Sequence, residues 1–248
     1  MAAAAPLVSC IVPVFNGERY LAEALDSVLA QTYRGTEVIV ADDGSADGTR
    51  GVAERYGPAV RFVTEPTAGP AATRNLGVRA ASGQFLAFLD ADDLWHEEKL
   101  ERQMARFREK PDLEACVTHV RMFWAPQLKD EENQYAANPR SGPVPGYATT
   151  TLLARREVFD KIGLFRTDLW FSDATERFMR AREQGVVLEL LPDVLTFHRM
   201  HEANLTRRRL DASKAEFARI VKERLDRRRD LLPRPASVNF SQARGEAK

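Results

Sequence analysis

The sequence predicts an α/β fold in which a mostly parallel central sheet is flanked by helices on both faces. Two observations favour this class. Apolar runs of strand length alternate with helical patterns through the first half of the 248 residues. The first run, residues 7–14, is almost entirely apolar, which is typical of a strand that is buried on both faces. A hydrophobic content of 44% and a charged content of 29% fit a folded domain with a substantial core.

The first half is expected to contain four strands, each followed by a helix. The expected strands are residues 7–14, 37–41, 60–64 and 84–89. The expected helices are residues 17–31, 47–56, 70–81 and 96–108. Asn16 is a candidate N-cap for the first helix, and Pro70 suits the first turn of the third.

The second half is less regular and is expected to form strands, short helices and one long loop. The expected strands are residues 115–123, 149–154, 186–191 and 194–198, and the expected helices are residues 157–162, 172–183 and 211–229. Residues 125–146 contain four prolines and two glycines without periodicity, so they are expected to form a loop that is functional or disordered. The helix over 211–229 has an apolar stripe at Phe217, Val221 and Leu225, and the last fifteen or so residues are expected to be mobile.

Charge and cysteine content exclude several classes of protein. The formal net charge is zero, which gives no general case for nucleic-acid binding. From residue 199 onward, however, there are 14 Lys and Arg against 7 Asp and Glu, so an acidic body precedes a basic end. Cys10 and Cys116 form neither a disulfide framework nor a zinc site, and they favour a reducing compartment. The N-terminus lacks the basic region of a signal peptide, and no run is long enough to span a membrane.

Two of the expected parallel strands end in acidic clusters. Residues 37–41 are followed by Asp42-Asp43-Gly44-Ser45, and residues 84–89 by Asp90-Ala91-Asp92-Asp93. Ligands collect beyond the carboxyl ends of strands in open parallel sheets, so the two clusters are placed to share one ligand. The first can accept hydrogen bonds from a nucleotide base or ribose, and the second can bind a divalent cation. A cation would also keep closely spaced carboxylates ionised. Each cluster alone is equally compatible with a turn or a helix cap.

The order and spacing of these motifs resemble family 2 glycosyltransferases, which have the GT-A fold. The resemblance rests on VSCIVPVFNGERYLAEALDSVLAQTY, EVIVADDGSADGT and AGPAATRNLGVRAASGQFLAFLDADDLW, and it continues more weakly to about residue 206. It implies one GT-A domain over residues 1–210, with a nucleotide-sugar-binding half over 1–110 and an acceptor half over 111–210. A basic helix and mobile tail over 211–248 would follow. It also implies an inverting transfer of sugar from a nucleotide-diphospho-sugar, most simply a UDP-sugar, with Mn²⁺ or Mg²⁺ as cofactor.

Positions that match the family's motifs are expected to bind the donor. The expected nucleotide-sugar contacts are Pro13, Phe15, Asn16, Asp42, Asp43, Arg74, Asn75, Asp90 and Asp92. Among them, Asp43 matches the base-binding aspartate, and Arg74 is placed to meet the phosphates. The expected metal-binding residues are Asp90, Asp92, Asp93 and His201, the last from a late segment that resembles the family's R-x-H…N-L-[ST] motif.

The general base is expected at the start of the helix over 172–183. Family members usually carry an E-D pair there, and a gapless match places Asp173 at the first acid and Ala174 at the second. Because the second acid is normally the base, Ala174 is a departure from the pattern. Asp173 is therefore the first candidate base, and Glu176, one turn further on, is the second.

These expectations favour an enzyme of polysaccharide or glycoconjugate synthesis that uses a saccharide or a lipid-linked acceptor. The alternative is a nucleotide-sugar-binding scaffold with weak or lost catalysis, supported by Ala174. The motifs of a dehydrogenase or methyltransferase, and the glycine-rich loop of a nucleotidyltransferase, are absent. A cytoplasmic location is expected. The basic helix either packs on the core or rests on an anionic membrane at its inner face. The sequence names neither the sugar, the acceptor, the linkage nor the oligomeric state.

Overall fold

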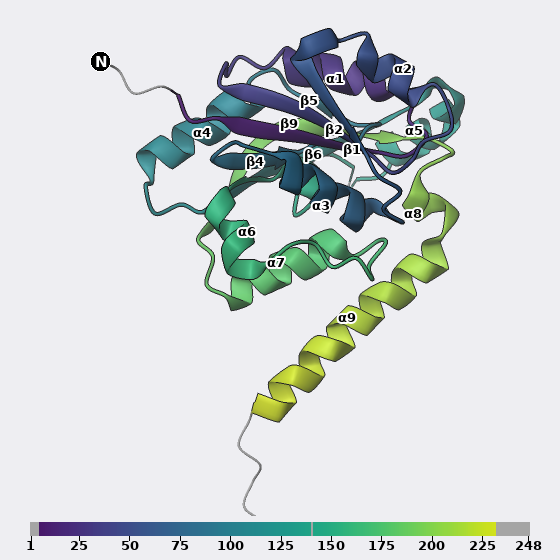
Figure 1. Ribbon diagram of the computed structural model, residues 1–248. Coiled ribbons are helices and arrows are strands. Elements are labelled where there is room, and N and C mark those ends of the chain that lie inside the picture. The colour runs from purple at the N-terminus through teal and green to yellow at the C-terminus, as the bar shows by residue number, and fades with distance from the viewer. Residues whose placement is uncertain (1–4, 140, 232–248) are drawn as a thin grey trace, which may run out of the picture.

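The computed structural model describes residues 5–139 and 141–231. They form an α/β fold in which one mixed β-sheet carries helices on both faces (Figure 1). The strand order is β3-β2-β1-β4-β8-β6-β9-β5, and β7 pairs with β6. The first four strands are mutually parallel and comprise β1 (Val8–Val14), β2 (Thr36–Asp42), β3 (Val60–Thr64) and β4 (Phe85–Phe88). The expected parallel half of the sheet is therefore confirmed.

The rest of the chain adds strands of both directions to the same sheet. Its strands are β5 (Leu94–Trp95), β6 (Ala115–Trp124), β7 (Val144–Pro145), β8 (Leu153–Arg155) and β9 (Leu188–Met200). Strand β8 joins the halves because it pairs antiparallel with both β4 and β6. Strand β9 lies parallel to β6 and carries its C-terminal end, with His198 and Arg199, toward β5 and the acidic residues that precede it.

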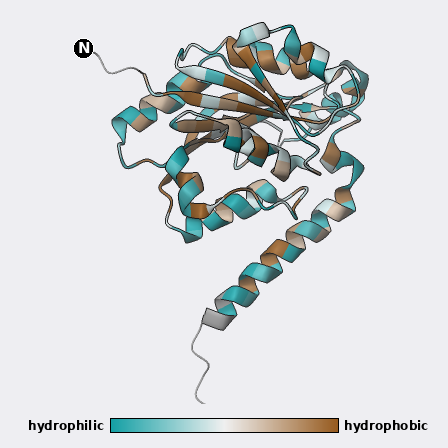
Figure 2. Cartoon of the chain, viewed as in Figure 1, coloured by the Kyte–Doolittle hydropathy of each residue, from teal (hydrophilic) through white to brown (hydrophobic). Residues whose placement is uncertain are grey.

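Helices cover both faces of the sheet and divide the core in two (Figure 2). One apolar cluster packs the sheet against α1 (Leu21–Leu29), α2 (Thr49–Glu54) and α4 (Lys99–Glu109). The other packs it against α3 (Pro70–Ala80), α6 (Arg156–Ile162) and α7 (Asp173–Glu183). Strand β1 shows the division, since Val8, Cys10, Val12 and Val14 belong to the first cluster and Ile11 to the second.

Short elements lie in several connections, including the long loop expected over residues 125–146. They are η1 (Gly57–Ala59), η2 (Pro126–Leu128), α5 (Lys129–Ala136), η3 (Thr149–Thr151) and α8 (Leu205–Arg208). The long helix α9 (Leu210–Leu231) runs past α7 and projects below the body in Figure 1. The mobile tail expected after it lies outside the described residues.

Several expected elements differ from the structure. Residues 94–95 form a strand on β9 that was not expected, and α4 begins at Lys99 instead of residue 96. The two strands expected over 186–198 form one continuous strand. Pro192 does not interrupt it, because this proline lies at a register shift in the pairing of β9 with β6, where its missing N–H is not needed. Asn16 does not cap α1; its side chain accepts from the Ala46 backbone N–H instead.

The buried face of α9 also differs from the expected stripe. Ile220 is its buried apolar residue, whereas Phe217 and Leu225 remain 48% and 60% exposed. Polar and ionic contacts with residues 166–172 and α7 turn the helix so that the stripe faces away from the body. No helix within the described residues is long and apolar enough to cross a membrane.

Candidate active site

The carboxyl ends of β1, β2 and β4 meet at one edge of the sheet, and the residues expected to bind a ligand follow them. Parallel pairing aligns Val14 with Asp42 and Ile11 with Phe88, so Phe15, Asp43 and Asp90 emerge side by side. Phe15 is 64% exposed, which leaves its ring free for a flat ligand.

The two acids after β2 have different surroundings. Asp42 is buried and accepts hydrogen bonds from the backbone N–H groups of Gly44 and Ser45 and from the Thr64 hydroxyl. It therefore stabilises the turn. Asp43 is half-buried and accepts from the backbone N–H groups of the segment 67–69, which enters α3. A carboxylate has about four lone-pair sites, so one remains on Asp43 for a ligand donor.

Three other residues that were expected to contact the nucleotide-sugar are buried to different depths. Pro13 is buried within β1. The Asn16 side chain and backbone bond to residues 45 and 46 and hold the two strand ends together. Asn75 is buried, and its amide group donates to the Phe165 carbonyl and accepts from the Phe165 N–H, each at 2.9 Å. Asn75 therefore connects α3 to the segment before α7.

Arg74 is the buried cation of the site and joins its two halves. One guanidinium nitrogen lies 2.7 Å from Asp90, and another lies 2.6 Å from Asp173 at the start of α7. These two carboxylates raise the pKa of Arg74 against the opposing effect of burial. The Arg74 Nε is buried without a hydrogen-bond partner in the described part of the chain.

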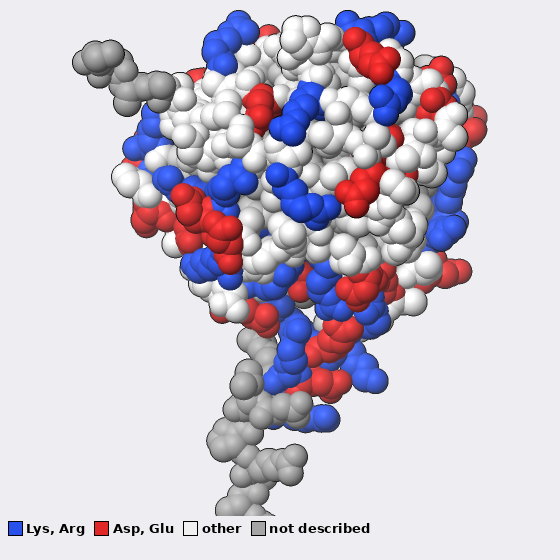
Figure 3. All heavy atoms as spheres, viewed as in Figure 1, with Lys and Arg blue, Asp and Glu red and all other residues white. Residues whose placement is uncertain are grey.

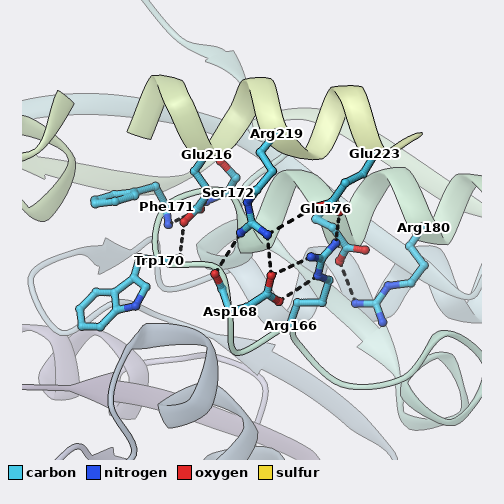
Figure 4. A network of polar contacts seen from close by, with 10 residues as sticks. All are labelled: Arg166, Asp168, Trp170, Phe171, Ser172, Glu176, Arg180, Glu216, Arg219 and Glu223. Atoms are coloured by element: carbon cyan, nitrogen blue, oxygen red, sulfur yellow. Dashed lines mark hydrogen bonds and ion pairs between the residues drawn. The ribbon is translucent and has the colours of Figure 1, made fainter. Parts of the chain in front are cut away.

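The two candidate bases point to different places. Asp173 contacts Arg74 through Oδ2, while its Oδ1 makes no hydrogen bond with the described residues. Glu176 pairs with Arg180 at 3.0 Å, on the side of α7 that faces Arg166 and Glu223 of α9 (Figure 4). Among the contacts of the described residues, none joins Glu176 to Arg74 or to the acids after β4. Only Asp173 lies at the site.

Histidines from the end of β9 accompany the other two acids. The His201 Nε2 lies 2.8 Å from Asp92 and lowers the pKa of this partly exposed carboxylate against the opposing effect of desolvation. The His198 Nδ1 lies 2.9 Å from Asp93, which is fully buried and also accepts from the Arg199 N–H. Burial raises the pKa of Asp93 to about 6, and the charge of Asp93 in turn raises that of His198 to about 9.

The protein itself therefore supplies positive charge near all three acids after β4, where a metal was expected to do so. Asp93 does not fit the expected role of metal ligand, because its oxygens are buried and bonded to His198 and Arg199. No group of three His, Cys, Asp or Glu side chains suited to a metal occurs among the described residues. Asp92 remains partly accessible, whereas His201 is buried, with Nε2 bonded to Asp92 and Nδ1 accepting from the Ala203 N–H.

Some residues of the site were not expected from the sequence. Arg199 donates to the Asp92 carbonyl and pairs with Glu23 of α1 at 2.8 Å, and Asn204 bonds to Asp92 and to the His201 N–H. Trp170, which is 42% exposed, packs against Gly69. The R-x-H…N spacing signalled the first two, but nothing in the local pattern distinguishes Trp170 from an ordinary loop residue.

Comparison with known proteins gives consistent results. Residues 9–163 match the protein family described as "Glycosyl transferase family 2". A Rickettsia typhi protein described as the uncharacterized glycosyltransferase RT0329 is 31% identical over 219 residues, which cover 81% of this chain and 66% of that protein. The chain thus spans just under two thirds of the length of this relative.

Two solved structures have the same fold. TarS 1–349 of S. aureus, in complex with UDP-GlcNAc, has a TM-score of 0.65 and 23% identity and covers 80% of this chain and 60% of that one. The mannosyltransferase PcManGT from Pyrobaculum calidifontis, in complex with GDP-Man and Mn²⁺, has a TM-score of 0.68 and 23% identity and covers 89% and 64%. The GT-A type of fold expected from the motifs is therefore confirmed.

Proposed function

The chain belongs to glycosyl transferase family 2, and from this premise we propose that it transfers a sugar from a nucleotide-diphospho-sugar to a hydroxyl acceptor with inversion. The observation that supports this most is the position of Arg74, which joins an acid of the donor edge, Asp90, to the candidate base Asp173. The proposed donor, metal and base functions would thereby be close together. Such an arrangement suits a direct displacement, in which the acceptor attacks opposite the leaving diphosphate.

The nucleotide is proposed to bind at the ends of β1 and β2. The exposed Phe15 ring would stack on the base, and the free lone pair of Asp43 would accept from a base N–H. A UDP-sugar is the proposed donor, and the UDP-GlcNAc complex of TarS supports it. The GDP-Man complex of PcManGT makes a GDP-sugar the alternative.

The diphosphate is proposed to bind with Mn²⁺ or Mg²⁺ between Asp90 and Asp92. Asp92 fits such an ion, because Mg²⁺ sites commonly use one or two carboxylates together with substrate phosphates, and His201 holds the Asp92 carboxylate in position. A bound cation would stabilise the negative charge of the departing nucleoside diphosphate. Asp93 holds His198 and the backbone of Arg199 in place, and Asp90 orients the guanidinium group of Arg74.

Asp173 is proposed as the general base. Its Oδ2 is fixed by Arg74, so Oδ1 is left to accept the proton of the acceptor hydroxyl. Ala174 cannot take this role, and Glu176 is directed into the ion pairs below α9. The second candidate function is a nucleotide-sugar-binding scaffold, which Ala174 favours because the usual second acid is missing.

The acceptor is proposed to be a saccharide or a lipid-linked saccharide of polysaccharide or glycoconjugate synthesis. Peripheral membrane contact through α9 would suit a lipid-linked acceptor. Leu210, Phe217 and Leu225 are exposed along one side of α9, and Lys214 and Lys222 have no ion-pair partner in the described part of the chain. In Figure 3, basic side chains mixed with acidic ones project from α9 below the body. A cytoplasmic location at the inner face of the membrane is part of this proposal.

Calorimetric titration tests the donor site. UDP, GDP and dTDP are titrated separately into the protein with and without Mn²⁺, and into Asp92→Asn. The proposal expects one nucleotide to bind tightly only with Mn²⁺, and this binding to be lost in Asp92→Asn. Absence of binding by all three with and without metal would overturn it. Tight metal-dependent binding without sugar transfer to any hydroxyl, water included, would favour the scaffold.

A further inference from the structure

Trp170 presents an indole side chain to solvent beside the candidate base. It precedes Asp173 by three residues. Its ring points away from Glu216, which accepts a hydrogen bond from its backbone N–H (Figure 4). Its indole N–H has no hydrogen-bond partner within residues 5–139 and 141–231.

The indole lies directly against the donor side of the site. A Cβ atom on Gly69 would lie 3.3 Å from the indole Cε2 and 3.4 Å from Cζ2, so a larger residue would push the ring away by a few tenths of an ångström. Gly69 also has a φ of 130°, which favours glycine. The Gly69 N–H donates to Asp43, and the next residue begins α3, which carries Arg74. The ring therefore lies between the segment 67–69, which bonds to Asp43, and the start of α7.

Glu216 of α9 holds the backbone that carries this ring. Its carboxylate accepts from the N–H groups of Trp170, Phe171 and Ser172 at 2.9, 2.8 and 2.7 Å (Figure 4). The Ser172 N–H is a donor that the start of α7 would otherwise leave unpaired, and Ser172 makes no side-chain cap. A carboxylate at this position also interacts favourably with the positive end of the helix dipole.

Ion pairs on the same face of α9 reinforce this attachment. Arg166 pairs with Glu223 at 2.8 Å and with Asp168 at 2.7 Å, and Arg219 pairs with Asp168 at 2.8 Å. The segment between α6 and α7 is thus fixed at both of its ends, since Asn75 holds Phe165. The indole is presented on a rigid support, which reduces the entropy lost when a ligand binds to it.

We propose that Trp170 is the platform on which the acceptor sugar stacks, and that Glu216 is the positioning residue that holds it. A pyranose ring with one face of C–H groups packs on an indole face, and the free indole N–H can donate to one of its hydroxyls. The acceptor hydroxyl must lie within hydrogen-bonding distance of the general base. Trp170 precedes the candidate base Asp173 by only three residues, so a sugar on its ring would lie close to that base. This inference rests on the proposed function, because it assigns the acceptor subsite of the same reaction.

The test uses a printed array of oligosaccharides, to which the protein is applied with UDP and Mn²⁺ so that the donor site is filled. The parent protein is expected to bind a subset of saccharides. Trp170→Ala is expected to weaken that binding about ten-fold, and Trp170→Phe to weaken it less. Phe217→Ala, which removes an aromatic ring of similar exposure from α9, serves as the matched control and is expected to bind like the parent.

A second set of variants tests the positioning role. Glu216→Ala is expected to weaken saccharide binding several-fold, and Glu216→Gln to restore part of it because an amide oxygen still accepts from backbone N–H groups. Glu223→Gln removes an ion pair of α9 but no backbone contact, so it controls for looser docking of the helix. UDP affinity is measured for every variant and is expected to be unchanged.

The possible results separate this inference from the proposed function. Equal saccharide binding by Trp170→Ala and the parent, or no saccharide binding by a parent that binds UDP, would overturn the platform. A loss of UDP affinity in Trp170→Ala would place the ring in the donor site instead and would also overturn it. Failure of the parent to bind any nucleotide would refute the donor site itself. Equal losses in Glu216→Ala and Glu223→Gln would reject the positioning role of Glu216.

Discussion

Arg74 and Asp173 are separated by 99 residues in the chain, yet their side chains lie 2.6 Å apart in a buried ion pair. This contact brings the start of α7 to the carboxyl edge of the parallel strands. Because Arg74 also contacts Asp90, one guanidinium group sets the distance between the donor side and the candidate base. Several expected results depend on this arrangement.

The two acids of α7 are expected to respond differently to substitution. Asp173→Asn should lower the rate of sugar transfer by about 10²- to 10⁴-fold, because a positioned base is lost. Glu176→Gln should leave the rate close to that of the parent, because Glu176 pairs with Arg180 and contacts neither Arg74 nor the acids after β4. Nucleoside diphosphate release at saturating donor measures both rates. Parent-like turnover by Asp173→Asn would reject it as the base.

Removal of Arg74 is expected to cost stability as well as activity. Arg74→Met leaves the buried carboxylate of Asp173 unpaired, which should lower the free energy of unfolding by about 3 kcal/mol. Arg50→Met, which removes an exposed pair with Glu54, should cost less than about 1 kcal/mol. Urea denaturation of both variants makes the comparison. A similar small loss in both would mean that the Arg74 pair contributes little.

The neighbouring acids Asp92 and Asp93 are expected to separate into two roles. Asp92→Asn should weaken Mn²⁺ binding in the presence of UDP by at least about ten-fold, with little change in stability. Asp93→Asn should instead lower the free energy of unfolding by about 1–3 kcal/mol, because Asp93 is fully buried and bonded to His198 and Arg199. Thermal melts and Mn²⁺ titrations distinguish them. The opposite pattern would return Asp93 to the role of ligand.

The buried Lys99 is expected to make stability depend on pH. Burial lowers its pKa to about 7, although its ammonium lies 4.2 Å from the Trp95 ring centroid and donates to Gln103. The unfolded chain holds this proton up to about pH 10, so it binds more protons than the folded chain above pH 7, and stability should rise with pH there.

The contribution of Lys99 is isolated by comparing the parent with Lys99→Met between pH 7 and 8.5. The opposing contributions of His198, whose pKa is raised to about 9, and of the buried thiols, whose pKa burial raises to about 12, are present in both proteins. Over this interval Lys99 should add about 1–2 kcal/mol to the stability of the parent. Lys99→Met should lack this gain, whatever its absolute stability. Urea denaturation at both pH values measures the two slopes. Equal slopes in the parent and in Lys99→Met would show that another group is responsible.

The parallel half of the fold could be predicted because its signals are local. Strands β1 to β4 are apolar runs that end in turns, and Pro70 begins α3 as expected. The second half depends on pairing between distant segments. Residues 94–95 became a strand only because β9 returns beside them, and no local pattern shows that return.

The site was predictable in its residue types but less so in their partners. Motif spacing located Asp90, Asp92, Arg74 and Asp173, and the structure brings them to one edge. It did not show that the carboxylates already have protein cations beside them, because those cations come from α3 and β9. Nor did it show that α9 contacts the segment before α7, since Glu216 is an ordinary helix acid by its neighbours in the sequence.

The central claim is that the acids beyond β4 bind a metal-associated nucleotide-sugar for transfer. The most direct measurement is the release of nucleoside diphosphate from a panel of UDP- and GDP-sugars, with Mn²⁺ or with a chelator, for the parent and for Asp92→Asn. The account predicts release from donors of one nucleotide with Mn²⁺, little with the chelator, and little from Asp92→Asn under either condition. Release with the chelator, or from Asp92→Asn, that equals the release by the parent with Mn²⁺ would contradict it, as would no release from any donor.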